Sequence, residues 1–183
     1  MITWPDNKLA VFHIPRTGGT SLSEHLKNMN NKYKIIKKEK LHEPLNVKMQ
    51  LTNVQDYTIL TPIRHPLARI VSLWHWSKVN PDKRYKYLRK LAKLPFGDFV
   101  QYYCEHMLSY DNWLLIDGKL PSNIKFIRLE NLLEDLEEIV NTDSYPHIYK
   151  TDHEPPEQYY TVELKQLVYE KEQWIFSQGV YRR

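Results

Sequence analysis

The stretch from residue 9 to residue 29 limits the possible folds of this chain more than any other. Residues 9–14 form a short apolar run with β-branched and aromatic members, which predicts a buried strand. A proline and two glycines end that strand, and leucines then recur at helical spacing, which predicts a helix over residues 20–29. A strand, a glycine-rich turn and a helix in direct succession are typical of an α/β fold that binds an anion at the turn.

Strands and helices alternate along the rest of the chain. Short runs of β-branched and aromatic residues predict further strands at 33–37, 57–61 and 124–129. Apolar spacing predicts helices at 67–78, 80–94, 96–108, 132–140 and 161–176, with loops at 38–56 and 141–158. This alternation predicts a P-loop-like, three-layer α/β/α fold with a central, mainly parallel sheet. A length of 183 residues without a linker predicts a single domain over 1–183.

Composition excludes several classes of protein. Aromatic residues make up 13% of the chain, which provides enough apolar surface for a folded core and argues against disorder. The net charge of +4 favours anionic partners, but the absence of a basic arm argues against nucleic acid. Cys104 is the single cysteine, so an internal disulfide and a cysteine-rich metal site are excluded. With neither a signal-peptide pattern nor a membrane-length apolar run, we expect a cytoplasmic protein without a membrane partner.

The turn after the first predicted strand has the chemistry of a phosphate cradle. Glycines let the backbone approach an anion closely, and the following helix presents free N–H groups and its positive dipole end. The predicted binding residues are Pro15, Arg16, Thr17, Gly18, Gly19, Thr20 and Ser21. The pattern differs from a Walker A loop, which has a Gly-Lys pair. The alternative interpretation is an ordinary connection between a strand and a helix.

The string Pro-Arg-Thr-Gly-Gly-Thr-Ser closely resembles the Pro-Lys-Thr-Gly-Gly-Thr-Ser loop of sulfotransferases that use 3′-phosphoadenosine 5′-phosphosulfate (PAPS). The resemblance implies that this loop grips the 5′-phosphosulfate. Arg16 stands where lysine is usual, as it does in tyrosylprotein sulfotransferases. Because arginine does not donate its proton, the expected role of Arg16 is electrostatic.

A second string, Arg64-His-Pro-Leu-Ala-Arg-Ile-Val-Ser72, resembles the family's 3′-phosphate motif, Arg-Asp-Pro-x-x-Arg-x-x-Ser. The resemblance implies that Arg64 and Ser72 bind the 3′-phosphate. His65 departs from the usual aspartate. Arg69 makes the pattern more similar to the carbohydrate sulfotransferases of the heparan and chondroitin type than to those acting on small molecules.

Two further segments are similar to the same family. Residues 126–135 resemble its Phe-x-Arg-Tyr-Glu-Asp-Leu segment, where we expect Glu130 to be structural. The loop containing Lys150 and Thr151 lies where relatives close over the nucleotide, which implies that both residues bind the cofactor.

The resemblance implies in-line transfer of a sulfuryl group to an acceptor hydroxyl. Arg16 would stabilise the charge that develops on the leaving oxygen. We expect His42 to be the general base, with Glu43 as the alternative, although a solvent-exposed loop histidine is an equal interpretation of His42. His13 lies inside a predicted strand, and we expect it to be packed in the core. A sulfuryl group carries a single negative charge, so no metal is expected.

The predicted function is therefore a PAPS-dependent sulfotransferase acting on an acceptor hydroxyl, with a carbohydrate favoured over a small alcohol or a tyrosine peptide. One alternative is a P-loop kinase, since residues 113–117 imitate a Walker B strand that ends in Asp117. The other is a non-catalytic module that binds PAPS or an anionic glycan. The basic stretch 83–93 is either a solvated helix face or a docking face for an anionic acceptor. No motif specifies the acceptor or the oligomeric state.

Overall fold

The computed structural model describes residues 1–29, 32–35, 42–50, 53–80, 86–137, 139 and 152–183. The chain divides into two compact units, Met1–Arg64 with Asn112–Tyr149, and His65–Asp111 with Lys150–Arg183. The single domain over 1–183 stays a prediction. Within the described ranges, no helix has both the length and the apolar character needed to cross a membrane.

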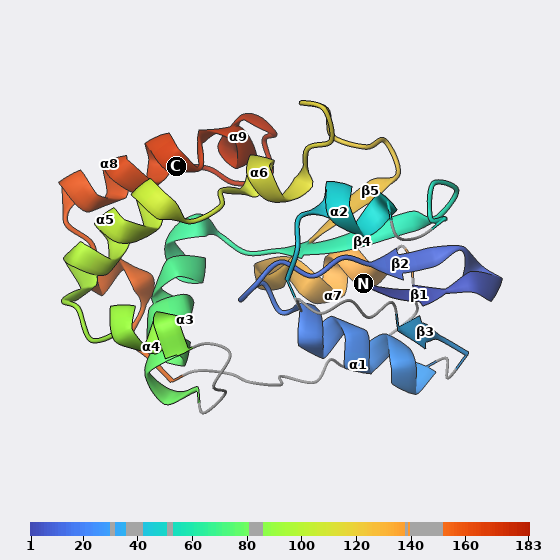
Figure 1. Ribbon diagram of the computed structural model, residues 1–183, viewed down its shortest axis with the longest axis horizontal. Coiled ribbons are helices and arrows are strands. Elements are labelled where there is room, and N and C mark those ends of the chain that lie inside the picture. The colour runs from blue at the N-terminus through green and yellow to red at the C-terminus, as the bar shows by residue number, and fades with distance from the viewer. Residues whose placement is uncertain (30–31, 36–41, 51–52, 81–85, 138, 140–151) are drawn as a thin grey trace. The chain divides into compact units, whose positions relative to one another are not determined.

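A five-stranded sheet, counted over the described residues, forms the core of the first unit in the order β3-β1-β2-β4-β5 (Figure 1). The strands are β1 (Ile2–Trp4), β2 (Leu9–Val11), β3 (Lys34–Ile35), β4 (Thr58–Ile63) and β5 (Ile124–Arg128). β2, β4 and β5 are parallel, with Val11 opposite Leu60 and Ile63 opposite Arg128. β1 pairs antiparallel with both β2 and β3. The predicted α/β fold with a mainly parallel centre is confirmed.

The antiparallel strand β1 is absent from the sequence prediction. A short 3₁₀ turn, Pro5–Asn7, connects β1 to β2. Lys8 follows with φ 48°, a left-handed conformation that reverses the chain. Three residues are too few for an apolar period to appear, so only the pairing with β2 identifies this strand.

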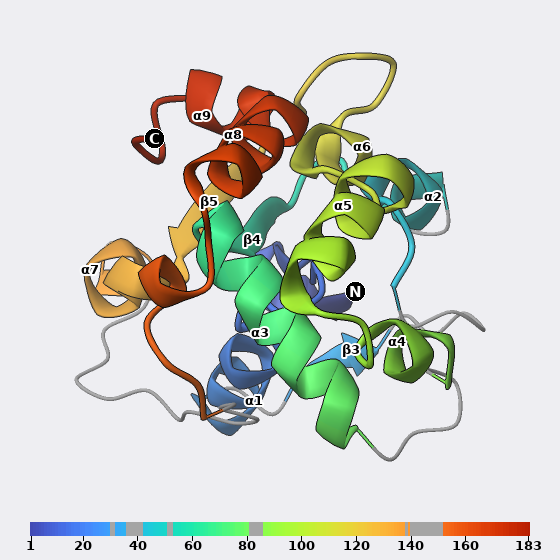
Figure 2. The same cartoon turned by 90° about the vertical axis from the view of Figure 1, so that its left-hand side faces the viewer.

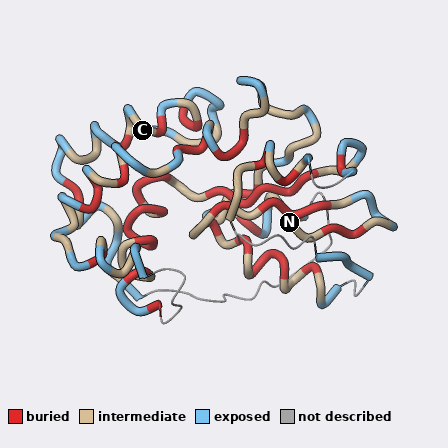
Figure 3. Tube along the Cα trace, viewed as in Figure 1, coloured by how far each residue is buried: buried red, intermediate tan, exposed pale blue. Residues whose placement is uncertain are grey.

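Helices cover both faces of the sheet. α1 (Gly19–Met29) and α7 (Leu132–Glu137) share one apolar cluster with the sheet. That cluster consists of Trp4, Val11, Leu22, Leu26, Leu60, Ile127, Leu132 and Leu136. α2 (Leu45–Gln50) lies on the opposite face (Figures 1 and 2). Figure 3 shows that β2 and β4 are buried along most of their length.

The helix α2 corrects the prediction of a loop over residues 38–56. The helix has six residues, and its two buried side chains are Leu45 and Lys48. A buried lysine interrupts the apolar period on which the prediction depended. The part of that predicted loop at residues 38–41 and 51–52 lies outside the described residues.

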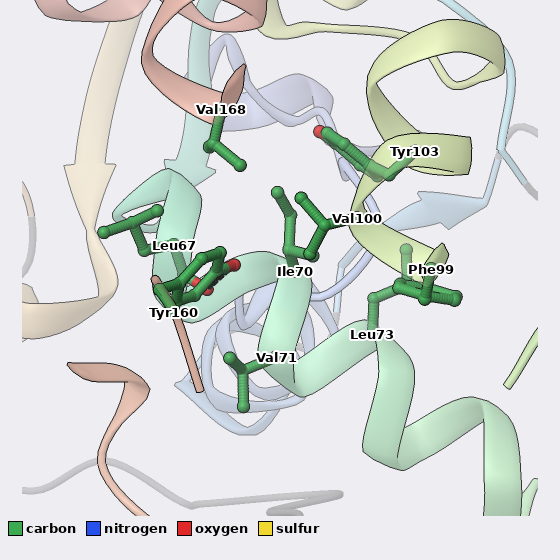
Figure 4. Packing of buried hydrophobic residues seen from close by; sticks show 9 residues of the cluster. All are labelled: Leu67, Ile70, Val71, Leu73, Phe99, Val100, Tyr103, Tyr160 and Val168. Carbon is green, nitrogen blue, oxygen red and sulfur yellow. Dashed lines mark hydrogen bonds between the residues drawn. The ribbon is translucent and has the colours of Figure 1, made fainter. Parts of the chain in front are cut away.

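The second unit is helical. It contains α3 (Pro66–Val79), α4 (Lys86–Leu91), α5 (Phe96–His106), α8 (Val162–Lys171) and α9 (Gln173–Ser177). α3 contacts both α5 and α8, which also contact each other (Figure 2). Their shared core consists of Leu67, Ile70, Val71, Leu73, Phe99, Val100, Tyr103, Tyr160 and Val168 (Figure 4). The short helix α6 (Tyr110–Leu114) carries the chain from the second unit back to the first.

The predicted helix over residues 161–176 is two helices, because the helical conformation ends at Glu172. This residue has φ −103° and ψ 19°, and it separates α8 from α9. Its carboxylate is buried and accepts a hydrogen bond from the Tyr103 hydroxyl on α5. Apolar spacing alone does not reveal such a break.

Candidate active site

The loop between β2 and α1 has the backbone of an anion cradle. Arg16 has φ 66° and Gly18 has φ 85°, so two residues of the loop are left-handed. The Thr17 hydroxyl donates to the Ile14 carbonyl over 2.8 Å, which closes the turn. α1 begins at Gly19 and places the predicted residues Thr20 and Ser21 in its first turn. The amides of a helix start and a nearby guanidinium together favour an anion.

Both glycines of the loop lie against close neighbours. A Cβ atom at Gly18 would lie 2.6 Å from Leu129 Cδ1, and one at Gly19 would lie 2.6 Å from His13 Cγ. Leu129 directly follows β5, and His13 follows β2. The carboxyl ends of two parallel strands therefore pack against the loop, as is usual for ligand sites in open α/β sheets.

The charges of two arginines influence each other in this unit. Burial first, and the charge of Arg64 second, lower the pKa of Arg16 to about 10. Arg16 still carries its charge at neutral pH. Arg64 comes directly after β4, which lies between β2 and β5. Two like charges brought together in a partly buried setting are stabilised by an anion between them, so the pair suits a phosphate or a sulfate ester.

His42 lies against His13. Their ring centroids are 5.0 Å apart with an interplanar angle of 86°, an edge-to-face contact. Burial, with a smaller contribution from the charge of His42, lowers the pKa of His13 to about 3. His13 is partly buried and neutral at physiological pH. The prediction that it is packed in the core did not include its contacts with Gly19 of the loop and with His42.

Glu43 forms an ion pair with a buried lysine. Lys48 Nζ lies 2.8 Å from Glu43 Oε2, and the lysine side chain is 4% exposed. α2 supplies Lys48, whose amide donates to the Pro44 carbonyl over 3.2 Å. Lys48 thus holds the side chain of Glu43, the alternative base, which follows His42 directly in the chain.

The second motif extends across the boundary between the units. Pro62 lies within β4, which extends beyond the strand predicted at 57–61, and Arg64 ends the first unit. Ser72 lies on α3 of the second unit, where its side chain is fully buried. Two further predicted residues, Lys150 and Thr151, lie outside the described residues.

The segment after β5 contains an ion pair that the sequence prediction overlooked. Asp135 accepts hydrogen bonds from Arg128 Nε over 3.0 Å, from Arg128 Nη2 over 2.6 Å and from the Arg128 backbone amide over 2.7 Å. Glu130, expected to be the structural carboxylate here, is exposed. The spacing of seven residues between an arginine and an aspartate around a turn was the available signal.

Asp117, considered above as a Walker B residue, lies in a tight hairpin turn. Ile116 and Lys119 exchange both backbone hydrogen bonds, over 2.9 Å and 3.0 Å. Asp117 and Gly118 have φ 50° and 74°, the pattern of a type I′ turn. The Asp117 side chain is exposed at this turn, which disfavours the kinase alternative.

The fold and the loop together define an α/β protein with an anion cradle at the ends of parallel strands. A model of the sulfotransferase family matches residues 1–155, so the chain belongs to that family. It is accordingly a PAPS-type sulfotransferase. Comparisons with curated proteins and with solved structures gave no match.

Proposed function

We propose that this protein transfers the sulfuryl group of PAPS to a hydroxyl group of a carbohydrate. The proposal depends chiefly on one observation: the loop between β2 and α1 has a left-handed Arg16 and Gly18 and leads directly into the start of α1, with Arg64 following the adjacent strand β4. One positive charge suits the 5′-phosphosulfate, and the other suits the 3′-phosphate, as the family motifs imply. That Arg64 shares the 3′-phosphate with Ser72 stays a prediction of the sequence.

PAPS supplies a sulfuryl group attached to a phosphate leaving group. Arg16 and the first amides of α1 bind that phosphate and stabilise the charge that develops on its bridging oxygen. His42 takes the proton of the acceptor hydroxyl as the acceptor oxygen bonds to sulfur and the bridging S–O bond breaks. Glu43 is engaged in its ion pair with Lys48, so in this proposal Glu43 orients the acceptor or His42, and His42 is the base.

A carbohydrate acceptor is supported by the second motif, in which Arg69 follows the carbohydrate-type pattern. It is also supported by the surface of α4, where Lys86, Tyr87 and Lys90 are exposed. Among its described residues this helix contains no acidic side chain. Such a surface favours a polymer of uronic acid and hexosamine. Metal-free transfer stays a prediction.

Calorimetric titration with adenosine 3′,5′-bisphosphate, 5′-AMP and ATP tests the nucleotide site. We expect the wild-type protein to prefer the bisphosphate in buffer without metal. Arg64→Ala should weaken bisphosphate binding by about 10- to 100-fold, the usual effect of losing a charge-assisted hydrogen bond. It should leave the affinity for 5′-AMP nearly unchanged. Lys119→Ala removes an exposed positive charge from the same unit and serves as the matched control.

Transfer is then tested with labelled PAPS on unsulfated chondroitin and N-acetylheparosan, with a small alcohol and a tyrosine peptide in parallel. Label in a polysaccharide supports the full proposal. Label in the alcohol or the peptide instead contradicts the carbohydrate part. If ATP with Mg²⁺ binds more tightly than the bisphosphate, the proposed function is wrong.

A further inference from the structure

His13 occupies a place where the phosphate loop and the candidate base meet. Its ring fills the space beside Gly19, the first residue of α1, so closely that a Cβ atom there would lie 2.6 Å from His13 Cγ. The ring also makes the edge-to-face contact with His42, at 5.0 Å between centroids. One side chain therefore contacts both the loop and His42.

The backbone of His13 is held by the sheet. Phe12 N donates to the Leu60 carbonyl over 3.0 Å, which ties the end of β2 to β4. The side chains of Phe12 and Ile14, on either side of His13, are 1% and 0% exposed. A ring attached to so constrained a backbone has little freedom, so it is suited to fixing the position of a neighbour.

We propose that His13 is a positioning residue for sulfuryl transfer, whose ring holds the His42 imidazole beside the start of α1. This inference rests on the proposed function. His13 does not compete for the transferred proton, because it remains neutral beside a protonated His42. The proton therefore passes from the acceptor hydroxyl to His42 and from there to solvent, while the ring of His13 remains packed against it.

The test compares two substitutions in the full chain, with bisphosphate release from PAPS measured in the presence of unsulfated chondroitin and with water alone. His13→Ala removes the ring and should lower kcat by about 10- to 100-fold, the cost of displacing a catalytic group by about 1 Å. The KM for PAPS should change by less than about threefold, because Arg16 and the loop amides are retained. His13→Phe keeps a ring of similar size and should retain most of kcat.

A double-mutant cycle separates positioning from a merely structural role. If His13 acts through His42, His13→Ala should lower the rate much less in a His42→Ala background than in the wild type. His25→Ala, which removes a histidine from α1 in the same unit, is the matched control and should leave kcat and KM unchanged. Thermal unfolding and bisphosphate affinity verify that each variant is folded.

Three results would overturn the inference. A wild-type kcat in folded His13→Ala means that the ring positions nothing. A loss in His13→Phe as large as in His13→Ala means that the ring nitrogens act directly. Additive losses in the cycle mean that His13 acts independently of His42. If the wild-type protein releases no bisphosphate from PAPS under either condition, the proposed function itself fails, and this inference fails with it.

Discussion

Arg69 and Glu172 form an ion pair in the interior of the second unit, with 3.4 Å between Arg69 Nη1 and Glu172 Oε1. Their side chains are 4% and 0% exposed. The Tyr103 hydroxyl donates to the same carboxylate and accepts from Arg69 Nη1 over 2.9 Å. The Tyr110 amide donates to Glu172 Oε2 over 2.9 Å. Arg69, which falls on the second motif, therefore binds a carboxylate on the C-terminal side of α8.

Glu172→Ala should lower the free energy of unfolding by about 3–5 kcal/mol, because it leaves the Arg69 charge buried without its carboxylate. Urea unfolding followed by circular dichroism measures this loss. Glu170→Ala, two residues earlier near the end of α8 and exposed, is the control and should change stability by less than about 0.5 kcal/mol. A loss at Glu172 as small as that of the control would contradict the importance of the ion pair.

Arg16→Asn should separate binding from stability. Arginine at φ 66° is strained by about 1–2 kcal/mol, whereas asparagine tolerates this conformation better. We expect the stability of the variant to be equal to that of the wild type or higher. Its bisphosphate affinity should fall about tenfold or more, because the positive charge that Arg16 places on the phosphate is lost. Calorimetry and urea unfolding measure the two effects.

The control for Arg16→Asn is Lys8→Asn, at another left-handed position, φ 48°, in the turn between β1 and β2. It should change stability in the same direction and leave bisphosphate affinity unaltered. An affinity loss in Lys8→Asn equal to that in Arg16→Asn would show that Arg16 has no specific role in binding the anion.

Gly19→Ala should destabilise the protein by about 1–3 kcal/mol, because the added methyl group overlaps the His13 ring. It should also reduce transfer, since either the loop or His13 must move. Gly97→Ala on α5 makes the same change where the nearest side-chain atom, Leu164 Cδ1, is 3.6 Å away. There we expect a gain of about 0.5–1 kcal/mol from helix propensity. Equal effects at the two positions would refute the close packing of His13 on Gly19.

Asp135 should make stability depend on acidity. Burial alone raises the pKa of Asp135, but the hydrogen bonds from the Arg128 side chain and backbone outweigh it and the net pKa is lowered. Because the pKa of Asp135 is lower in the folded state, its carboxylate stabilises the fold at pH values above the unfolded pKa, near 3.9. This stabilisation is lost as the pH falls through the folded pKa. Asp135→Asn should therefore reduce the pH dependence of the free energy of unfolding below about pH 4. Glu134→Gln, which alters an exposed neighbour, should leave the wild-type slope.

Several elements could be predicted because their determinants are local. The strand β4 and the helices α1 and α5 could be predicted because apolar residues recur at strand or helix spacing within each segment itself. The helix α2 and the strand β1 could not be predicted, since each is short and acquires its apolar contacts from distant parts of the chain. The break at Glu172 was missed because its carboxylate binds side chains of Arg69 and Tyr103 and the backbone amide of Tyr110, all on other helices.

The sequence by itself determined the family and the phosphate loop, because the glycines, the arginine and the hydroxyl residues of residues 15–21 act through local backbone conformation. Only the tertiary structure decided which residues those groups meet. His13 against Gly19 and His42, and Arg69 against Glu172, 103 residues away, are consequences of packing. Burial then changes the chemistry, since partial removal of solvent around His13 in the fold lowers its pKa to about 3.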